Sequence, residues 1–194
     1  MEEKIKKLLF SCNPINIELA FTISKDTEKI AMKEFKELID FIEERTLRPN
    51  YSFRDGSCRQ YGMKHFIKEA IKHWTSKKHF SLGCVEIKKL PDNIGILKNL
   101  ENLSIPYNEL TELPNSFENL ESLRKLNLCS NNFTKFPKVL FKLKKLDYLH
   151  IDGNNISEEE ILKFSNELPE CFVTYDPNQG SKKKRIILNN KKIV

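Results

Sequence analysis

Residues 100–122 read LENLSIPYNELTELPNSFENLES, residues 123–145 read LRKLNLCSNNFTKFPKVLFKLKK, and residues 146–159 read LDYLHIDGNNISEE. The three segments align at an interval of 23 residues, so apolar residues and an asparagine recur at fixed offsets, with a proline as well in the first two. In the first segment these positions are Leu100, Leu103, Ile105, Asn108, Leu110, Leu113, Pro114, Phe117 and Leu120. Self-similarity at such a period indicates a stacked repeat architecture, in which each unit is one short supersecondary element.

The repeat extends toward the N-terminus in a degenerate form. Its apolar spacing is kept at Phe80, Leu82, Ile87, Leu90, Pro91, Ile94 and Leu97. Lys77 and Val85 break the pattern. Over about residues 79–160 the chain resembles the leucine-rich repeat family, in the 23-residue subclass with a Leu-Pro pair in the second half of each unit. The resemblance implies an α/β solenoid with parallel β-strands on its concave face, and protein–protein interaction as its usual function.

Physical chemistry agrees with that fold. Each L-x-x-L-x-L segment predicts a short strand whose alternate apolar residues point inward, and neighbouring units stack these strands in parallel. Asn108, Asn131 and Asn154 fall where the chain turns away from the strand. A side-chain amide there can bond backbone groups that no strand ladder reaches. Because one unit cannot bury its own apolar face, stacking must supply the core.

The N-terminal part, residues 1–76, predicts an all-α capping domain for the open end of the array. Four stretches follow a helical period. The residues that mark them are Ile5, Leu8, Leu9, Ile17, Ala20, Phe21, Ala31, Phe35, Leu38, Ile42, Met63, Phe66, Ile67, Ala70, Ile71 and Trp74. A long polar loop is expected at residues 46–59. Trp74 needs an apolar partner beside Phe80, which would join the helices to the array.

Two helix starts carry capping signals. Asn13 followed by Pro14 predicts an N-cap and first helical residue for the second helix. Ser157 and Glu160 have the spacing of a capping box. They open an expected closing helix over residues 157–168.

The solenoid with its C-terminal cap is expected over residues 77–180, ending in a last strand at residues 172–175. The tail, residues 181–194, reads SKKKRIILNNKKIV and allows two interpretations. The part IILNNKKIV predicts a small hairpin or strand that covers the end of the array. Alternatively, the part KKKR is a handle for nucleic acid or an anionic surface.

Charge separates the tail from the rest of the chain. The 194 residues carry 33 Lys and Arg against 27 Asp and Glu, a formal net charge of +6. All of the surplus lies in the tail, at Lys182, Lys183, Lys184, Arg185, Lys191 and Lys192. The neutral remainder disfavours nucleic acid as the main partner, since such proteins neutralise many phosphates.

Cysteine usage and hydropathy favour a cytoplasmic protein. The five cysteines are an odd number without a CxxC pair, which suits reduced thiols. Glu2 and Glu3 stand where a secretory signal would carry positive charge. No stretch approaches the roughly 18 apolar residues of a membrane helix. No cofactor or metal site is expected, and a monomer is the default expectation.

The resemblance places a binding surface on the concave face, between the inward leucines. The candidate partner-binding residues are Asn102, Ser104, Lys125, Asn127, Cys129, Tyr148, His150 and Asp152. The 23-residue register puts Asn102, Lys125 and Tyr148 in one row. Hydrogen-bonding groups together with a tyrosine suit a modest protein-binding surface. Alternatively, these residues are only solvent-tolerant strand positions.

One pair on this face invites a catalytic interpretation. Cys129 lies diagonally across from His150, which suggests a nucleophile and its base. Diagonal neighbours in a sheet are about 7–8 Å apart, which is long for a productive hydrogen bond. The sequence therefore predicts that the protein is not an enzyme.

Charged residues also recur at the repeat interval, with alternating sign. Three ladders are expected: Lys89–Glu112–Lys135, Lys98–Glu121–Lys144 and Glu101–Arg124–Asp147. Exposed pairs contribute only about 0–1 kcal/mol each. Their expected role is to set the register between units.

The function that the sequence favours is a non-catalytic module that binds a protein through the concave face. One alternative is an enzyme or regulator with its activity in residues 1–76 and the repeats as a targeting arm. A second alternative is weak binding of nucleic acid or an anionic surface through the tail.

Overall fold

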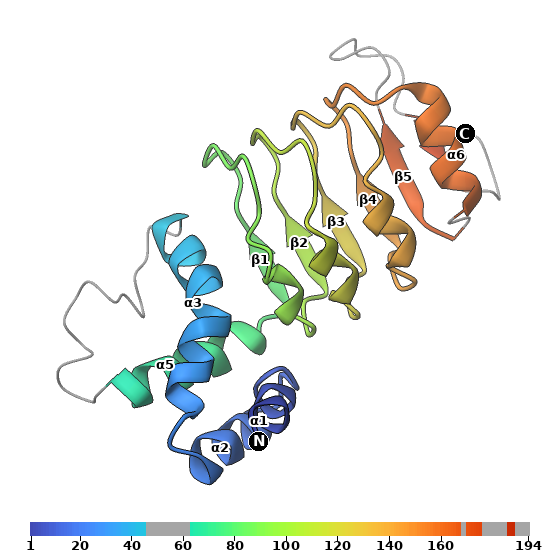
Figure 1. The fold of residues 1–194 in the computed structure, drawn as a ribbon. Coiled ribbons are helices and arrows are strands. Elements are labelled where there is room, and N and C mark those ends of the chain that lie inside the picture. The colour runs from blue at the N-terminus through green and yellow to red at the C-terminus, as the bar shows by residue number, and fades with distance from the viewer. Residues whose placement is uncertain (46–62, 168–169, 176–185, 189–194) are drawn as a thin grey trace.

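The computed structural model describes residues 1–45, 63–167, 170–175 and 186–188. Within these ranges, helices come first and a stack of strand–turn units follows (Figure 1). The helices are α1 (Glu2–Leu9), α2 (Pro14–Ile23), α3 (Thr27–Arg45), α5 (Met63–Thr75) and α6 (Glu158–Glu167). The strands are β1 (His79–Ser81), β2 (Asn102–Ser104), β3 (Lys125–Asn127), β4 (Tyr148–His150), β5 (Phe172–Tyr175) and β6 (Ile186–Leu188). Short 3-10 helices lie between strands: η1 (Ile94–Ile96), η2 (Asn115–Asn119) and η3 (Lys138–Lys142).

The strands form one sheet in chain order. Strands β1 to β5 are parallel, and β6 pairs antiparallel with β5. Leu103 pairs with Leu126, and Leu126 with Leu149, so the register between strands equals the 23-residue interval of the sequence. The expected fold class is confirmed: an α/β leucine-rich-repeat solenoid with five parallel strands, preceded by helices.

Buried asparagines hold the turns that follow the strands. The Oδ1 atom of Asn131 accepts the N–H of Leu110 at 3.0 Å. Its Nδ2 donates to the carbonyls of Ile105 and Leu128 at 2.9 and 3.1 Å. These bonds reach the preceding unit, and Asn108 and Asn154 make equivalent ones. The asparagine of each unit thus satisfies backbone groups that three-residue strands leave unpaired.

In every unit the residue just before the position of the asparagine is left-handed, and the first unit has a second left-handed residue, Glu86. The residues before the asparagine position are Cys84, Tyr107, Ser130 and Gly153, with φ between 53° and 68°. Only the last is glycine, and its neighbour explains why. A Cβ on Gly153 would lie 2.9 Å from the Oγ of Ser130.

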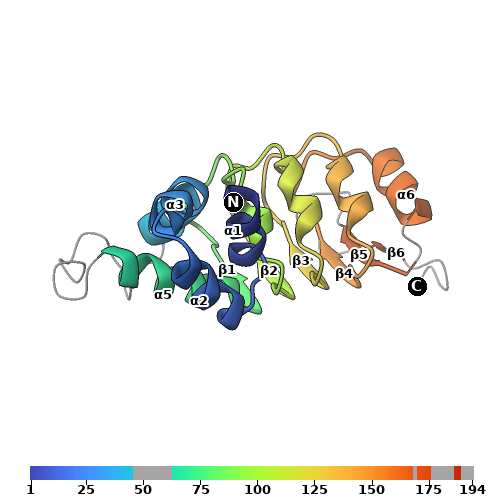
Figure 2. The ribbon, with the colours of Figure 1, turned by 60° about the horizontal axis from the view of Figure 1, so that its bottom comes forward.

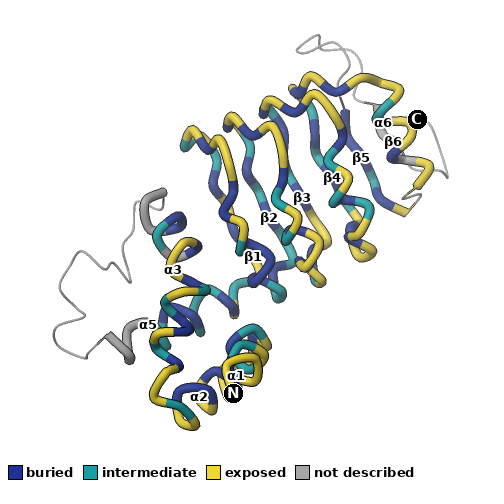
Figure 3. The backbone as a smooth tube through the Cα atoms, viewed as in Figure 1, coloured by how far each residue is buried: buried dark blue, intermediate teal, exposed yellow. Residues whose placement is uncertain are grey.

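A continuous apolar core runs from the helices to the last parallel strand. The inward residues of the repeats, such as Phe117 and Leu126, are fully buried (Figure 3). The 3-10 helices pack closely on the side of the array away from the strands (Figure 2). A Cβ on Gly95 would lie 2.0 Å from the carbonyl oxygen of Ser116, so η1 can approach η2 only with glycine there.

The helical segment is joined to the first repeat by apolar and polar contacts. The rings of Trp74 and Phe80 lie 5.7 Å apart in an edge-on arrangement, as the sequence predicts. The Nδ2 of Asn99 donates to the carbonyls of Cys12 and Thr75 at 3.2 and 2.9 Å. The first repeat therefore bonds the loop between α1 and α2 and the end of α5 directly.

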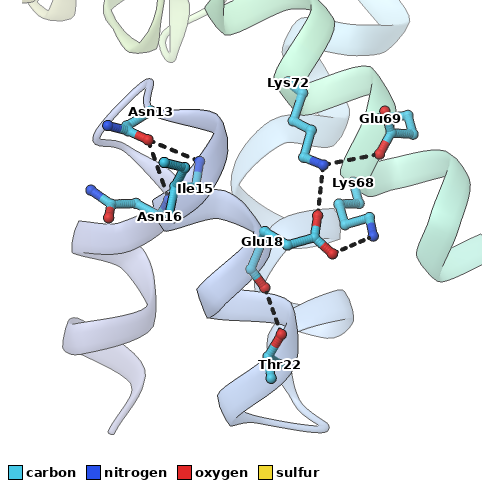
Figure 4. Close-up of polar contacts among 8 residues, drawn as sticks. All are labelled: Asn13, Ile15, Asn16, Glu18, Thr22, Lys68, Glu69 and Lys72. Atoms are coloured by element: carbon cyan, nitrogen blue, oxygen red, sulfur yellow. Dashed lines mark hydrogen bonds and ion pairs between the residues drawn. The ribbon is translucent and has the colours of Figure 1, made fainter.

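The two capping signals have different outcomes. Asn13 Oδ1 accepts the N–H of Ile15 at 2.8 Å, so this N-cap is confirmed (Figure 4). Ser157 Oγ accepts the N–H of Glu160 at 3.3 Å, which is half of the expected capping box. The other half is wrong, because the Glu160 carboxylate accepts the N–H of Phe136 at 3.2 Å instead. Glu160 thus ties the closing helix to the preceding unit.

Ion pairs on the helical surface link α2 to α5. Glu18 accepts from Lys68 at 2.8 Å and from Lys72 at 2.6 Å (Figure 4). These bonds, that of Lys68 first, lower the pKa of Glu18 to about 2.

Parts of the expected architecture lie outside the described residues. The loop at residues 46–59 is one of them, and so is most of the tail. Strand β6 agrees with the interpretation that the tail covers the end of the sheet. None of the described helices combines the length and the apolar composition that crossing a bilayer requires.

Candidate functional site

The parallel strands display two rows of side chains on one face of the sheet. Alternate residues of a strand point to the same side, and the strand pairing aligns them across units. One row is His79, Asn102, Lys125, Tyr148 and Phe172. The next is Ser81, Ser104, Asn127, His150 and Thr174. The two rows lie between the buried leucines, as the sequence predicts for β2 to β4.

This face is hollowed. A depression of about 470 Å³ opens over β1 to β4. Its lining includes six of the eight candidate residues, which are Asn102, Ser104, Lys125, Asn127, Tyr148 and His150. The Lys125 side chain is exposed at the centre of its row and has no ion pair within the described part of the chain. The depression therefore offers one cation surrounded by neutral hydrogen-bonding groups.

An aromatic platform closes one end of the first row. The rings of Tyr148 and Phe172 stack at 5.5 Å with an interplanar angle of 16°. His150 meets the Tyr148 ring edge-on at 6.5 Å. The sequence did not place Phe172 in this row, since it follows Tyr148 by 24 residues and the repeat pattern has ended there. Alternation within β5 was the signal that could have revealed it.

His150 is held by an acidic neighbour. Its Nε2 lies 2.6 Å from Asp152 Oδ2, and both side chains are largely buried. The other carboxylate oxygen, Asp152 Oδ1, and the hydroxyl of Thr174 are buried without a hydrogen-bond partner in the described part of the chain. This arrangement fixes the imidazole and leaves buried acceptors beside the depression.

Cys129 does not share the setting of the other candidates. It lies beyond the end of β3, is buried, and does not line the depression. Its backbone N–H donates to Asn127 Oδ1 at 3.0 Å. The imidazole that a catalytic cysteine would need is bonded to Asp152. Of the eight candidates, Cys129 thus offers the least surface to a partner.

Comparison with known proteins identifies the repeats. The family described as leucine-rich repeat region matches residues 57–170, more than half of the chain. The chain belongs to the leucine-rich repeat family. Proteins of this family commonly bind other proteins, and the match is to a repeat region rather than to a catalytic family.

Two solved structures are similar to this leucine-rich repeat protein. One is a leucine-rich repeat protein of Leptospira interrogans, with 38% identity and a TM-score of 0.48, covering 50% of this chain and 24% of that one. The other is an internalin from Listeria monocytogenes, with 23% identity and a TM-score of 0.46, covering 54% of this chain and 29% of that one. The chain thus spans less than a third of either. No curated protein gives a significant match.

Ion pairs between the repeats follow only part of the expected ladders. Three of the expected contacts form: Lys89–Glu112 at 3.5 Å, Lys98–Glu121 at 2.9 Å and Arg124–Asp147 at 3.0 Å. Glu101 turns to Lys78 at 2.9 Å rather than to Arg124, and the bond from Lys78 lowers the pKa of Glu101. Each paired acid therefore serves one neighbour, and the ladders are broken after one step.

A metal site would need several ligating side chains close together within the described residues. In those ranges no three His, Cys, Asp or Glu side chains gather as metal ligands would. The carboxylates of Glu18 in α2 and Glu69 in α5 are engaged in the ion pairs of Figure 4.

Proposed function

We propose that the hollowed face of the sheet, from β1 to β5, binds a protein partner without catalysis. The observation that carries the proposal is the depression itself, in which exposed Lys125 stands beside Tyr148, whose ring stacks on that of Phe172 in the next strand. Rigid aromatic area next to a charged group is the composition typical of residues that dominate binding. The neighbouring amides and hydroxyls would supply hydrogen bonds around this centre.

The test starts by capturing the partner from the native host and identifying it by mass spectrometry. The purified partner is then titrated against Lys125→Ala/Tyr148→Ala. We expect at least about a tenfold loss of affinity, equal to about 1.4 kcal/mol. The control, Tyr107→Ala/Lys163→Ala, removes an exposed tyrosine and an exposed lysine that do not line the depression. Unchanged affinity of the first variant, with folding intact, would place the site elsewhere.

We further propose that residues 1–76 cap the solenoid rather than act as an independent unit. The Trp74–Phe80 contact and the bonds from Asn99 to both Cys12 and Thr75 support this role. A fragment that starts at residue 77 would expose the Phe80 edge of the core. It should aggregate and melt at a lower temperature than the full chain, and a monomeric fragment of unchanged stability would contradict the proposal.

The remaining features of the proposal concern class and location. The 23-residue register and the Leu-Pro pairs support the 23-residue subclass of the family. The odd number of cysteines supports a reducing compartment, which we take to be the cytoplasm.

A further inference from the structure

Net charge alternates in sign from one repeat to the next. In residues 100–122 every charged residue is acidic: Glu101, Glu109, Glu112, Glu118 and Glu121. In residues 123–145 every charged residue is basic: Arg124, Lys125, Lys135, Lys138, Lys142, Lys144 and Lys145. Residues 146–168 are again mostly acidic, with Lys163 as the exception among Asp147, Asp152, Glu158, Glu159, Glu160 and Glu167. A basic repeat is therefore stacked between two acidic ones.

The acids of the second repeat do not neutralise this basic repeat. Glu109, Glu112 and Glu121 pair backward with lysines of the first repeat, at 3.7, 3.5 and 2.9 Å. From the following segment Asp147 pairs with Arg124, and the Glu160 carboxylate accepts the backbone N–H of Phe136 at 3.2 Å. The lysines left over are exposed and make no ion pair in the described ranges: Lys135, Lys138, Lys142, Lys144 and Lys145. We name these five residues the lysine strip.

The lysine strip lies away from the binding face proposed above. Its residues follow β3 and precede β4, and two of them are the ends of η3. The 3-10 helices line the side of the array opposite the strands (Figure 2). Lys138 and Lys142 therefore lie on the outer side of the solenoid, with Lys135 in the turn before η3 and Lys144 and Lys145 in the turn that leads to β4. Exposed Glu112 and Glu118 lie in the repeat before the lysine strip, and exposed Glu158 and Glu159 in the segment after it.

We propose that the lysine strip binds a narrow acidic segment of a protein partner. Five uncompensated ammonium groups attract an anionic chain, and the acidic repeats on both sides confine it to the strip by repulsion. A broad polyanion, such as a membrane surface or a nucleic-acid duplex, would also meet those acids. The two aromatic rings between residues 135 and 145, Phe136 and Phe141, pack against Phe164. They are thereby committed to the fold rather than to stacking with bases.

The test uses a fluorescein-labelled octaglutamate peptide, titrated with the full chain at low ionic strength. Lys138→Gln/Lys142→Gln/Lys145→Gln should weaken binding by at least about tenfold. The matched control, Lys182→Gln/Lys183→Gln/Lys184→Gln, removes the same charge from the tail and should weaken it by less than about twofold. Equal losses in the two variants, or no binding by the unaltered chain, would overturn the proposal. Since the altered residues are exposed, unchanged melting curves should accompany the loss.

Two further titrations separate the other classes of polyanion. Phosphatidylserine vesicles and single-stranded DNA should respond less to the strip variant than octaglutamate does. A larger loss for vesicles or DNA would overturn the assignment to an acidic protein segment. Lys125→Ala should leave octaglutamate affinity within about twofold, because Lys125 lies on the sheet face, and a loss as large as that of the strip variant would overturn the placement. The lysine-strip proposal can therefore be overturned while the concave-face proposal stands, and the reverse.

Discussion

The helical segment and the repeats both contain fully buried apolar side chains, yet they satisfy their backbone polar groups in different ways. In the helices the hydrogen bonds are internal, and only the ends need help. Asn13 provides it from an exposed position at the start of α2. In the repeats the strands are three or four residues long, and buried Asn131 bonds backbone groups of two consecutive units.

The two regions therefore differ in how far each depends on its neighbours for its hydrogen bonds. A helix pairs its backbone polar groups internally and closes its start with a local cap, so its hydrogen bonds depend little on distant residues, although its stability still needs tertiary packing. A repeat exists only when its neighbour supplies both the apolar cover and the partner for its turn. The same residue type, asparagine, is therefore peripheral in one region and central in the other.

The largest expected effect comes from truncating a buried leucine, which each of the two regions contains. Leu126 in β3 and Leu38 in α3 are both fully buried. Truncation of either to alanine should lower the free energy of unfolding by about 2–5 kcal/mol. Chemical denaturation of the two variants measures this. A cost below about 1 kcal/mol for Leu126→Ala alone would show that the stacked core is loosely packed.

The next effect compares the two asparagines directly. Asn131→Ala leaves the N–H of Leu110 and several carbonyls without partners in the interior, which should cost about 2–3 kcal/mol. Asn13→Ala removes the acceptor for the backbone N–H groups of Ile15 and Asn16, but water can replace it there. This substitution should cost about 1 kcal/mol. Equal costs of the two substitutions, measured by thermal or denaturant unfolding, would remove the distinction between the exposed helix cap and the buried turn asparagine.

The smallest effect concerns the surface ion pairs of the helical segment. The folded-state pKa of Glu18 lies at about 2, below the ordinary glutamate value of about 4.3. Its stabilisation is therefore present above pH 4.3 and is lost as the pH falls through 2. Because the side chain is half-exposed, Glu18→Gln should cost no more than about 1 kcal/mol at neutral pH.

The difference between Glu18→Gln and the unaltered chain should shrink when unfolding is measured between pH 5 and pH 2. Glu37→Gln is the control, because exposed Glu37 makes no ion pair with any residue the structure describes. A larger cost for the control would contradict the assignment of the bonds in Figure 4.

The sequence predicts the repeats well because each rule there is periodic. The 23-residue spacing of Leu103, Leu126 and Leu149 is the strand register itself, and the asparagine positions are the buried amides. The helical starts at Asn13 and Ser157 could also be predicted, because capping depends on residues within one turn.

Features that depend on packing between units could not be predicted from the sequence. Phe172 joins the Tyr148 row at an interval of 24 residues, where the period has ended. Cys129 keeps the expected register yet is buried after β3. Glu160 and Glu101 each choose one of two partners within reach, and side-chain geometry in three dimensions decides which.

The hollowed strand face is proposed to receive the partner, and this placement can be tested directly. The most direct measurement places a photo-crosslinking amino acid at position 125 in the depression, or at exposed Asn115 in η2 on the opposite side. Irradiation of the complex with the captured partner should give a crosslinked product from position 125 and little from position 115. Crosslinking that is equal at the two positions, or stronger at position 115, would contradict the claim.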